Sequence, residues 1–142
     1  MAIEYTPENI TELKPNEIFV FGSNTAGQHI GGAARIAYEK FGAKWGKAEG
    51  LSGQTYAIPT INYYSFEKVS EEYLKECLVD FIRFCRQNKD KKFYLTKIGC
   101  GIAGWEIKEI KRLFTESMLL CIFPDNLVVP KEFLNEQEYE KR

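Results

Sequence analysis

Two glycine-rich loops carry the groups in this sequence that could do chemistry. The first, GSNTAGQHIGG, spans residues 22–32, and the second, GCGIAG, spans residues 99–104. Each follows an apolar run and precedes a stretch with helical spacing. Backbone N–H groups at a helix N-terminus have no internal partner, and glycine lets a ligand approach the backbone closely. The two loops together therefore predict a site that holds a phosphate or diphosphate.

Several side chains in or beside these loops have more than one interpretation. Asn24 could contact a ligand or brace the turn, and His29, the only histidine, could be a solvated loop residue or an acid or base near neutral pH. Cys100 could be a nucleophile, because a helix N-terminus favours the thiolate, although a small side chain beside a phosphate is the favoured interpretation. Tyr63 and Tyr64 follow a predicted strand and could contact a nucleotide base or be ordinary loop aromatics.

The elements that must position these loops alternate along the chain. Short apolar runs predict strands at residues 17–22, 54–59, 92–99 and 126–130, and apolar residues at helical spacing predict helices at residues 33–41, 71–87 and 106–118. Ser70 is the predicted N-cap of the middle helix. Strands alternating with helices predict an α/β fold, with helices on both faces of a mainly parallel sheet. Ligands bind such sheets outside the carboxyl ends of the strands, where both loops are expected.

Composition limits the class of protein. The 142 residues predict a single domain, 1–142, with a core at about residues 17–130. A net charge of -1 argues against a general binder of nucleic acid or membrane surfaces. The N-terminus has no signal-peptide pattern, and no apolar run is long enough to span a bilayer. The four cysteines lack CxxC or zinc-type spacing, so we expect a reduced, cytoplasmic protein without structural disulfides, metal or cofactor.

The order of the motifs resembles the macro domain family, most closely the short macro-domain-like proteins of phages and bacterial genomes. The segments that carry the resemblance are FVFGSNTAG at 19–27, GGAA at 31–34, GLSGQTYAIP at 50–59 and IGCGIAGW at 98–105. The resemblance covers residues 18–130. It implies a three-layer α/β/α sandwich that binds ADP-ribose or a related NAD-derived nucleotide, which a phage protein could sequester or process.

The resemblance also implies roles for individual residues. Asn24 stands where macro domains contact the distal ribose, and Trp105 stands where an aromatic ring packs near that ribose. The first loop is expected to approach the ribose and diphosphate, and the second to clasp the diphosphate. The implied ligand-binding residues are Gly22, Ser23, Asn24, Gly31, Gly32, Ala33, Gly99, Cys100, Gly101, Ile102, Ala103, Gly104 and Trp105, and the catalytic candidates are Asn24 and His29.

Two departures from the family pattern leave the activity open. Many hydrolytic macro domains carry an aspartate that orients water shortly after the paired glycines, where this chain has Ala34. The aspartate that bonds adenine has no clear match, and the N-terminal region offers Glu8, Glu12 and Glu17. We therefore expect nucleotide binding. The alternatives are an ADP-ribosyl hydrolase, for which ADP-ribosylated nucleic acid could be a substrate, and a ligand-free scaffold; the sequence predicts no oligomeric state.

Overall fold

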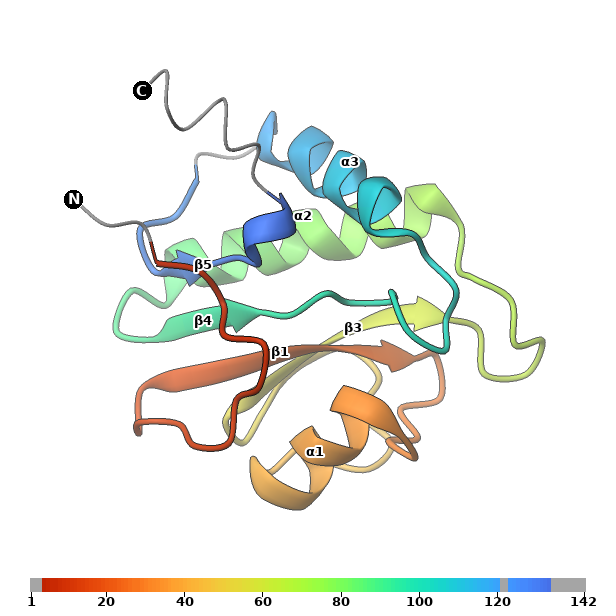
Figure 1. The fold of residues 1–142 in the computed structure, drawn as a ribbon, viewed down its shortest axis with the longest axis horizontal. Helices are drawn as coiled ribbons and strands as arrows, with labels where there is room; N and C mark the ends of the chain where they lie inside the picture. Colours follow the sequence, from red (N-terminus) through yellow and green to blue (C-terminus); the bar gives the residue numbers. More distant parts are fainter. Residues whose placement is uncertain (1–3, 121–122, 134–142) are drawn as a thin grey trace.

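A five-stranded sheet forms the middle layer of the protein (Figure 1). The computed structural model describes residues 4–120 and 123–133, so Cys121 lies outside the described residues. The strands are β1 (Glu17–Asn24), β2 (Gly50–Ser52), β3 (Thr55–Ile61), β4 (Lys92–Leu95) and β5 (Leu127–Val128), in the spatial order β2-β3-β1-β4-β5. All neighbours are parallel except β2, which pairs antiparallel with β3.

Helices cover both faces of the sheet. Helix α1 (Gly32–Lys40) lies on one face, and α2 (Glu71–Gln87) and α3 (Ile107–Met118) lie together on the other (Figure 1). A 3-10 turn, η1 (Lys131–Phe133), follows β5. The predicted three-layer α/β/α sandwich with a mainly parallel, mixed sheet is confirmed. None of the described helices contains a stretch long and apolar enough to cross a membrane.

Strand β1 contributes side chains to both apolar cores of the protein. Ile18 and Val20 pack into the larger apolar cluster beneath α2 and α3, whereas Phe19 and Phe21 pack into the smaller cluster beneath α1. Successive side chains of a strand point to opposite faces, so a strand covered on both sides must be apolar at every position. The continuous apolar run of β1 therefore predicted its central place correctly.

The local signals at α2 are confirmed. The Ser70 hydroxyl accepts a hydrogen bond from the backbone N–H of Tyr73 at 3.1 Å, which caps the helix. Cys77 and Cys85 are buried on its inner face, as their spacing indicated. Burial raises the pKa of Cys77 to about 12, which disfavours its thiolate at neutral pH.

Several strand boundaries and one strand differ from the prediction. β1 continues past Gly22 to Asn24, and β5 is shorter than predicted, Leu127–Val128. β3 continues through Pro59 to Ile61. Proline has no N–H to donate, but the pairing of β3 with β2 already ends at Ala57, so no hydrogen bond to β2 is lost at Pro59. β4 ends at Leu95 instead of residue 99. Strand β2 was not predicted, because its glycine-rich surroundings resemble a loop. Gly53, with φ +56, makes the turn from β2 to β3.

Candidate functional site

A crevice of about 530 Å³ opens at the carboxyl ends of the central strands. The loops that follow β1 and β4 lie at the same end of the sheet (Figure 1). Most of the predicted ligand-binding residues line this crevice: Gly22, Ser23, Asn24, Gly31, Gly32, Ala33, Gly99, Gly101, Ile102 and Ala103. The predicted residues that do not line it are His29, Cys100, Gly104 and Trp105. The parallel order of β3, β1 and β4 thus brings the two glycine loops together.

Asn24 holds the first loop in shape. Its Oδ1 accepts hydrogen bonds from the backbone N–H groups of Ala26 (3.1 Å) and Gln28 (3.0 Å), and its Nδ2 donates to the Gln28 carbonyl (2.8 Å). An amide nitrogen carries two hydrogens, so one remains to donate to a ligand in the crevice. Asn24 therefore braces the turn, as one of its two interpretations predicted, and the residue also lines the crevice.

The first turn of α1 presents backbone donors to the crevice. The N-cap residue, Gly31, makes no side-chain cap, and the first turn contains no acidic residue. Gly32, Ala33 and Ala34 all line the crevice, and N–H groups of a first helical turn have no intrahelical partner. The helix dipole adds partial positive charge there. Gly32 has φ +58, and a Cβ there would meet nothing within 4 Å, so backbone conformation and not lack of space favours glycine.

The second loop rests on Trp105. The indole Nε1–H donates to the Thr60 carbonyl at 2.8 Å, and the side chain is only 4% exposed. A Cβ on Gly99 would lie 2.7 Å from Cδ1 of Trp105. Trp105 therefore supports Gly99 from inside the protein and does not line the crevice, which corrects the expectation that its ring packs against a ligand ribose.

The N-terminus of α3 is closed by its own side chains. The Glu109 carboxylate accepts a hydrogen bond from the backbone N–H of Glu106, the N-cap residue, at 2.9 Å, as in a capping box. Two carboxylates beside these donors disfavour an anion, so α3 does not supply the second half of a helix-based phosphate clamp. The second loop reaches the crevice only through its own residues, chiefly Gly99, Gly101 and Ile102.

Comparison with solved structures identifies the architecture. The macrodomain of Mycobacterium tuberculosis DarG superposes with a TM-score of 0.62 at 18% identity, covering 91% of this chain and 97% of that one. Thermosipho africanus DarTG in complex with ADP-ribose gives 0.53 at 16% identity, covering 80% of this chain but 38% of that one. A macrodomain protein from Streptomyces coelicolor gives 0.54 at 11% identity, covering 85% and 91%. The chain has a macro-domain-like fold. No protein-family model and no curated protein sequence matches it.

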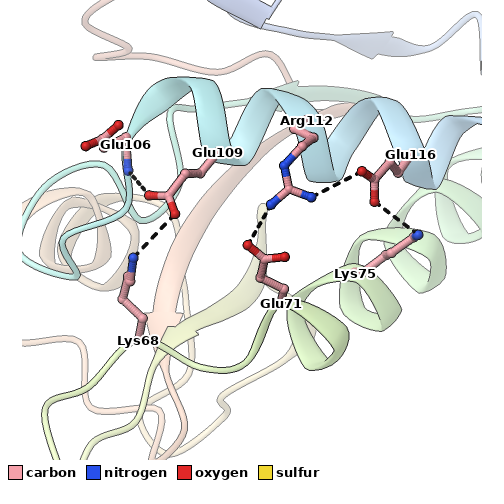
Figure 2. A network of polar contacts seen from close by, with 7 residues as sticks. All are labelled: Lys68, Glu71, Lys75, Glu106, Glu109, Arg112 and Glu116. Carbon is pink, nitrogen blue, oxygen red and sulfur yellow. Dashed lines mark hydrogen bonds and ion pairs between the residues drawn. The ribbon is translucent and has the colours of Figure 1, made fainter.

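In this macro-domain-like chain, ion pairs tie the helix after the second loop to α2 (Figure 2). Arg112 of α3 donates to Glu71, the first residue of α2, at 2.6 Å. Lys68 contacts Glu109 at 3.5 Å, and its Nζ lies 4.7 Å from the centroid of the Trp105 ring. These pairs are half-exposed, so each contributes little stability alone.

His29 occupies the interior and not the crevice. It is 1% exposed, its Nε2 lies 3.0 Å from the Lys44 carbonyl, and its ring meets that of Phe21 at 5.2 Å. Among the described residues, its Nδ1 has no hydrogen-bond partner. Burial lowers the pKa of this imidazole, so it is neutral. The interpretation of His29 as a solvated loop residue is therefore wrong. Its interpretation as a catalytic acid or base is wrong as well, because the ring does not reach the crevice.

Cys100 is also turned away from the crevice. Its Sγ bonds the Ile98 carbonyl at 3.5 Å, and it is half-buried against the larger core. Burial raises the pKa of this thiol, although the nearby Lys97 lowers it in part. The thiolate that a nucleophile needs is disfavoured, which argues against nucleophilic catalysis by Cys100.

Sequence reasoning missed several residues of the crevice wall. Thr60, Phe66, Thr96 and Lys97 line it, although none belongs to a glycine motif. Thr60 lies near the carboxyl end of β3, and the other three follow β3 or β4, so their place at this end of the sheet was the available signal. In the described part of the chain, Lys97 and Tyr63 are the ionisable side chains of this lining, and Lys97 already pairs with carboxylates of Glu8 (3.0 Å) and Glu132 (2.5 Å).

A second cavity of about 420 Å³ adjoins the crevice. The two share Gly32, Ala33, Thr96 and Lys97 in their walls, and residues 6–11 form the far side of the second cavity. Of the three glutamates considered as the residue that bonds adenine, Glu8 lines this cavity. Glu17 instead accepts hydrogen bonds from the Lys14 N–H and the Tyr94 hydroxyl. The described residues contain no group of three or more His, Cys, Asp or Glu side chains that could hold a metal ion.

Proposed function

We propose that this protein binds ADP-ribose or a related NAD-derived nucleotide in the crevice between α1 and the second glycine loop. One observation carries the proposal: the uncapped first turn of α1, with no acidic residue, faces Gly99 and Gly101 across a crevice of about 530 Å³. Such a helix N-terminus suits a phosphate group. The fold shared with DarTG, whose structure contains ADP-ribose, supports this choice of ligand.

The shape of the two cavities supports a ligand longer than a mononucleotide. They meet at the first turn of α1, because Gly32 and Ala33 belong to both walls. A diphosphate at this junction would place one nucleoside end in the cavity lined by residues 6–11. The other ribose would then lie beside Asn24, whose free amide hydrogen can donate to a hydroxyl.

The lining favours binding over hydrolysis. Ala34 lines the crevice at the position where hydrolytic relatives carry an aspartate, and a methyl group cannot orient water. General acid–base catalysis needs a titratable group within hydrogen-bond reach of the reacting atoms. Within the described residues, the lining offers only Lys97 and Tyr63 as ionisable side chains, and Lys97 is held by two carboxylates. A ligand-free scaffold would have no need for the open donors of α1.

The test is calorimetric titration with ADP-ribose, with AMP as the shorter comparison. Gly101 offers a clean variant because it lines the crevice, and a Cβ there would meet nothing within 4 Å. Gly101→Glu should weaken ADP-ribose binding at least tenfold by placing a carboxylate near the phosphates. Gly101→Gln, of similar size and without charge, should weaken it less.

Two outcomes would overturn the proposal. One is that the folded wild-type protein gives no binding signal for ADP-ribose at millimolar concentration. The other is that Gly101→Glu and Gly101→Gln bind ADP-ribose as the wild type does. Thermal unfolding of each sample verifies that the variants are folded.

A further inference from the structure

Two aromatic rings stand in solvent at the mouth of the crevice, beside the half-buried ring of Tyr63. Tyr64 is 84% exposed and Phe66 is 74% exposed, and both contact Tyr63, with ring centroids 5.2 and 6.3 Å away. We call Tyr63, Tyr64 and Phe66 the aromatic rim. Large apolar side chains that gather in solvent mark binding surfaces, because exposing them is unfavourable.

Hydrogen bonds of Asn62 close the turn that carries the aromatic rim. The Asn62 Oδ1 accepts hydrogen bonds from the backbone N–H groups of Tyr64 (3.0 Å) and Ser65 (3.2 Å). The Asn62 carbonyl accepts from Phe66 at 2.9 Å, and the Asn62 N–H donates to Glu67 at 2.7 Å. Phe66 is held at φ +59, which is unfavourable for a non-glycine residue. The turn therefore keeps an exposed phenyl ring in place at a conformational cost, which no packing in the core explains.

The aromatic rim adjoins the ribose end of the proposed site. Tyr63 and Phe66 line the same crevice as Asn24, and the Tyr63 N–H donates to the Thr25 hydroxyl at 3.0 Å. None of the rim residues lines the second cavity, which meets the crevice at Gly32 and Ala33. The rim thus lies at the end of the crevice opposite to the place proposed for the adenosine.

We propose that the aromatic rim stacks against a planar heteroaromatic ring attached to the distal ribose of the ligand. The preferred ligand is then ADP-ribose that carries a nicotinamide ring on its distal ribose, as NAD does, and this ligand is preferred over free ADP-ribose. This inference rests on the proposed function.

The local charge favours a single attached ring over a nucleic-acid strand. Lys68, the basic residue next to the turn, is engaged by Glu109 and by the Trp105 ring. Glu67 is the other charged neighbour in the chain. Proteins that follow a single strand combine stacking rings with a positively charged groove, and the described residues of this turn offer no such groove.

The experiment compares NAD with ADP-ribose, because NAD adds a planar ring to the distal ribose. Tyr64→Ala and Phe66→Asn remove the two exposed rings, and asparagine tolerates the positive φ at position 66. Tyr73→Ala is the matched control, because Tyr73 is an exposed aromatic residue of α2 that does not line the crevice. In calorimetry, Tyr64→Ala should lose about tenfold in affinity for NAD and less than twofold for ADP-ribose, because Tyr64 does not line the crevice. Phe66→Asn, whose residue does line the crevice, should lose more affinity for NAD than for ADP-ribose, and the Tyr73→Ala control should lose neither.

Three results would overturn the inference. Wild-type protein could bind ADP-ribose and not NAD. The rim variants could weaken both ligands equally, which would make the rim part of the crevice wall alone. Sedimentation could show a dimer of the wild type that Phe66→Asn dissociates, which would make the rim an interface between copies. Failure to bind ADP-ribose at all would instead refute the proposed function.

Discussion

Gly99→Ala is the substitution whose effect follows most directly from the structure. Gly99 has φ +73, a region that costs an alanine about 1–2 kcal/mol. The added Cβ would also lie 2.7 Å from Trp105 Cδ1 and 3.2 Å from Thr60 Cβ. Trp105 cannot yield easily, because its indole is buried and bonded to the Thr60 carbonyl. Overpacking of this kind costs about 1–3 kcal/mol, so the expected loss of unfolding free energy is about 3 kcal/mol.

Gly101→Ala is the matched control in the same loop. A Cβ at Gly101 meets nothing within 4 Å, and its φ lies outside the positive region. Its effect on stability should stay within about 0.5 kcal/mol, or be slightly favourable because alanine restricts the unfolded chain.

Urea unfolding followed by tryptophan fluorescence measures both variants, with the slope of the transition checked for constancy. In a chain of this size, about 3 kcal/mol corresponds to a fall in Tm of about 10 °C. Equal stability of Gly99→Ala and Gly101→Ala would refute the reasoning that Trp105 requires a glycine above it.

Three further predictions concern side chains of the loops. Burial lowers the pKa of His29 below its ordinary value of 6.5, so the unfolded chain binds this proton first and the free energy of unfolding should fall as the pH drops from 7.5 to 5.5. Over the same pH range, the urea midpoint of His29→Gln should fall less than that of the wild type, and an equal fall would exclude His29 as the cause. Asn24→Ala removes three hydrogen bonds within the first loop, so it should cost about 1–3 kcal/mol in urea unfolding and weaken ADP-ribose binding in calorimetry at least tenfold; unchanged affinity would remove Asn24 from the site. Burial raises the pKa of Cys100, so site-resolved mass spectrometry should find it alkylated by iodoacetamide at pH 7.5 no faster than a cysteine in an unfolded peptide, and faster labelling would indicate an activated thiolate.

The two glycine loops look alike in sequence but differ in what their glycines do. Gly32 has open space around it, and glycine is favoured there by the positive φ at the start of α1, where backbone donors face the crevice. Gly99 is required by a tryptophan six residues further along, which packs from the interior. Sequence spacing predicted that both loops would reach one crevice and together hold a phosphate or diphosphate, and it did not distinguish between the helices that follow them. The capping box at Glu106 and Glu109 shows that they are not equivalent, since only α1 has an open N-terminus.

The sequence by itself determined the layers of the fold and the end of the sheet where the crevice lies. Continuous apolar residues in β1, helical spacing in α2 and glycines after two parallel strands are local signals, and each is governed by backbone geometry and burial within a few residues. The N-cap at Ser70 belongs to the same class, because a cap is made within four residues.

Tertiary structure alone decided which side chains face the crevice. His29 and Trp105 were candidates for ligand contact because they lie in or beside the glycine loops, yet both are buried. Their direction depends on partners distant in the chain, such as the Lys44 carbonyl for His29 and the Thr60 carbonyl for Trp105. Phe66 is exposed instead of buried, because a turn closed by Asn62 holds its ring in solvent. Side-chain direction is set by packing and hydrogen bonds between segments, and no local pattern of residue types encodes these contacts.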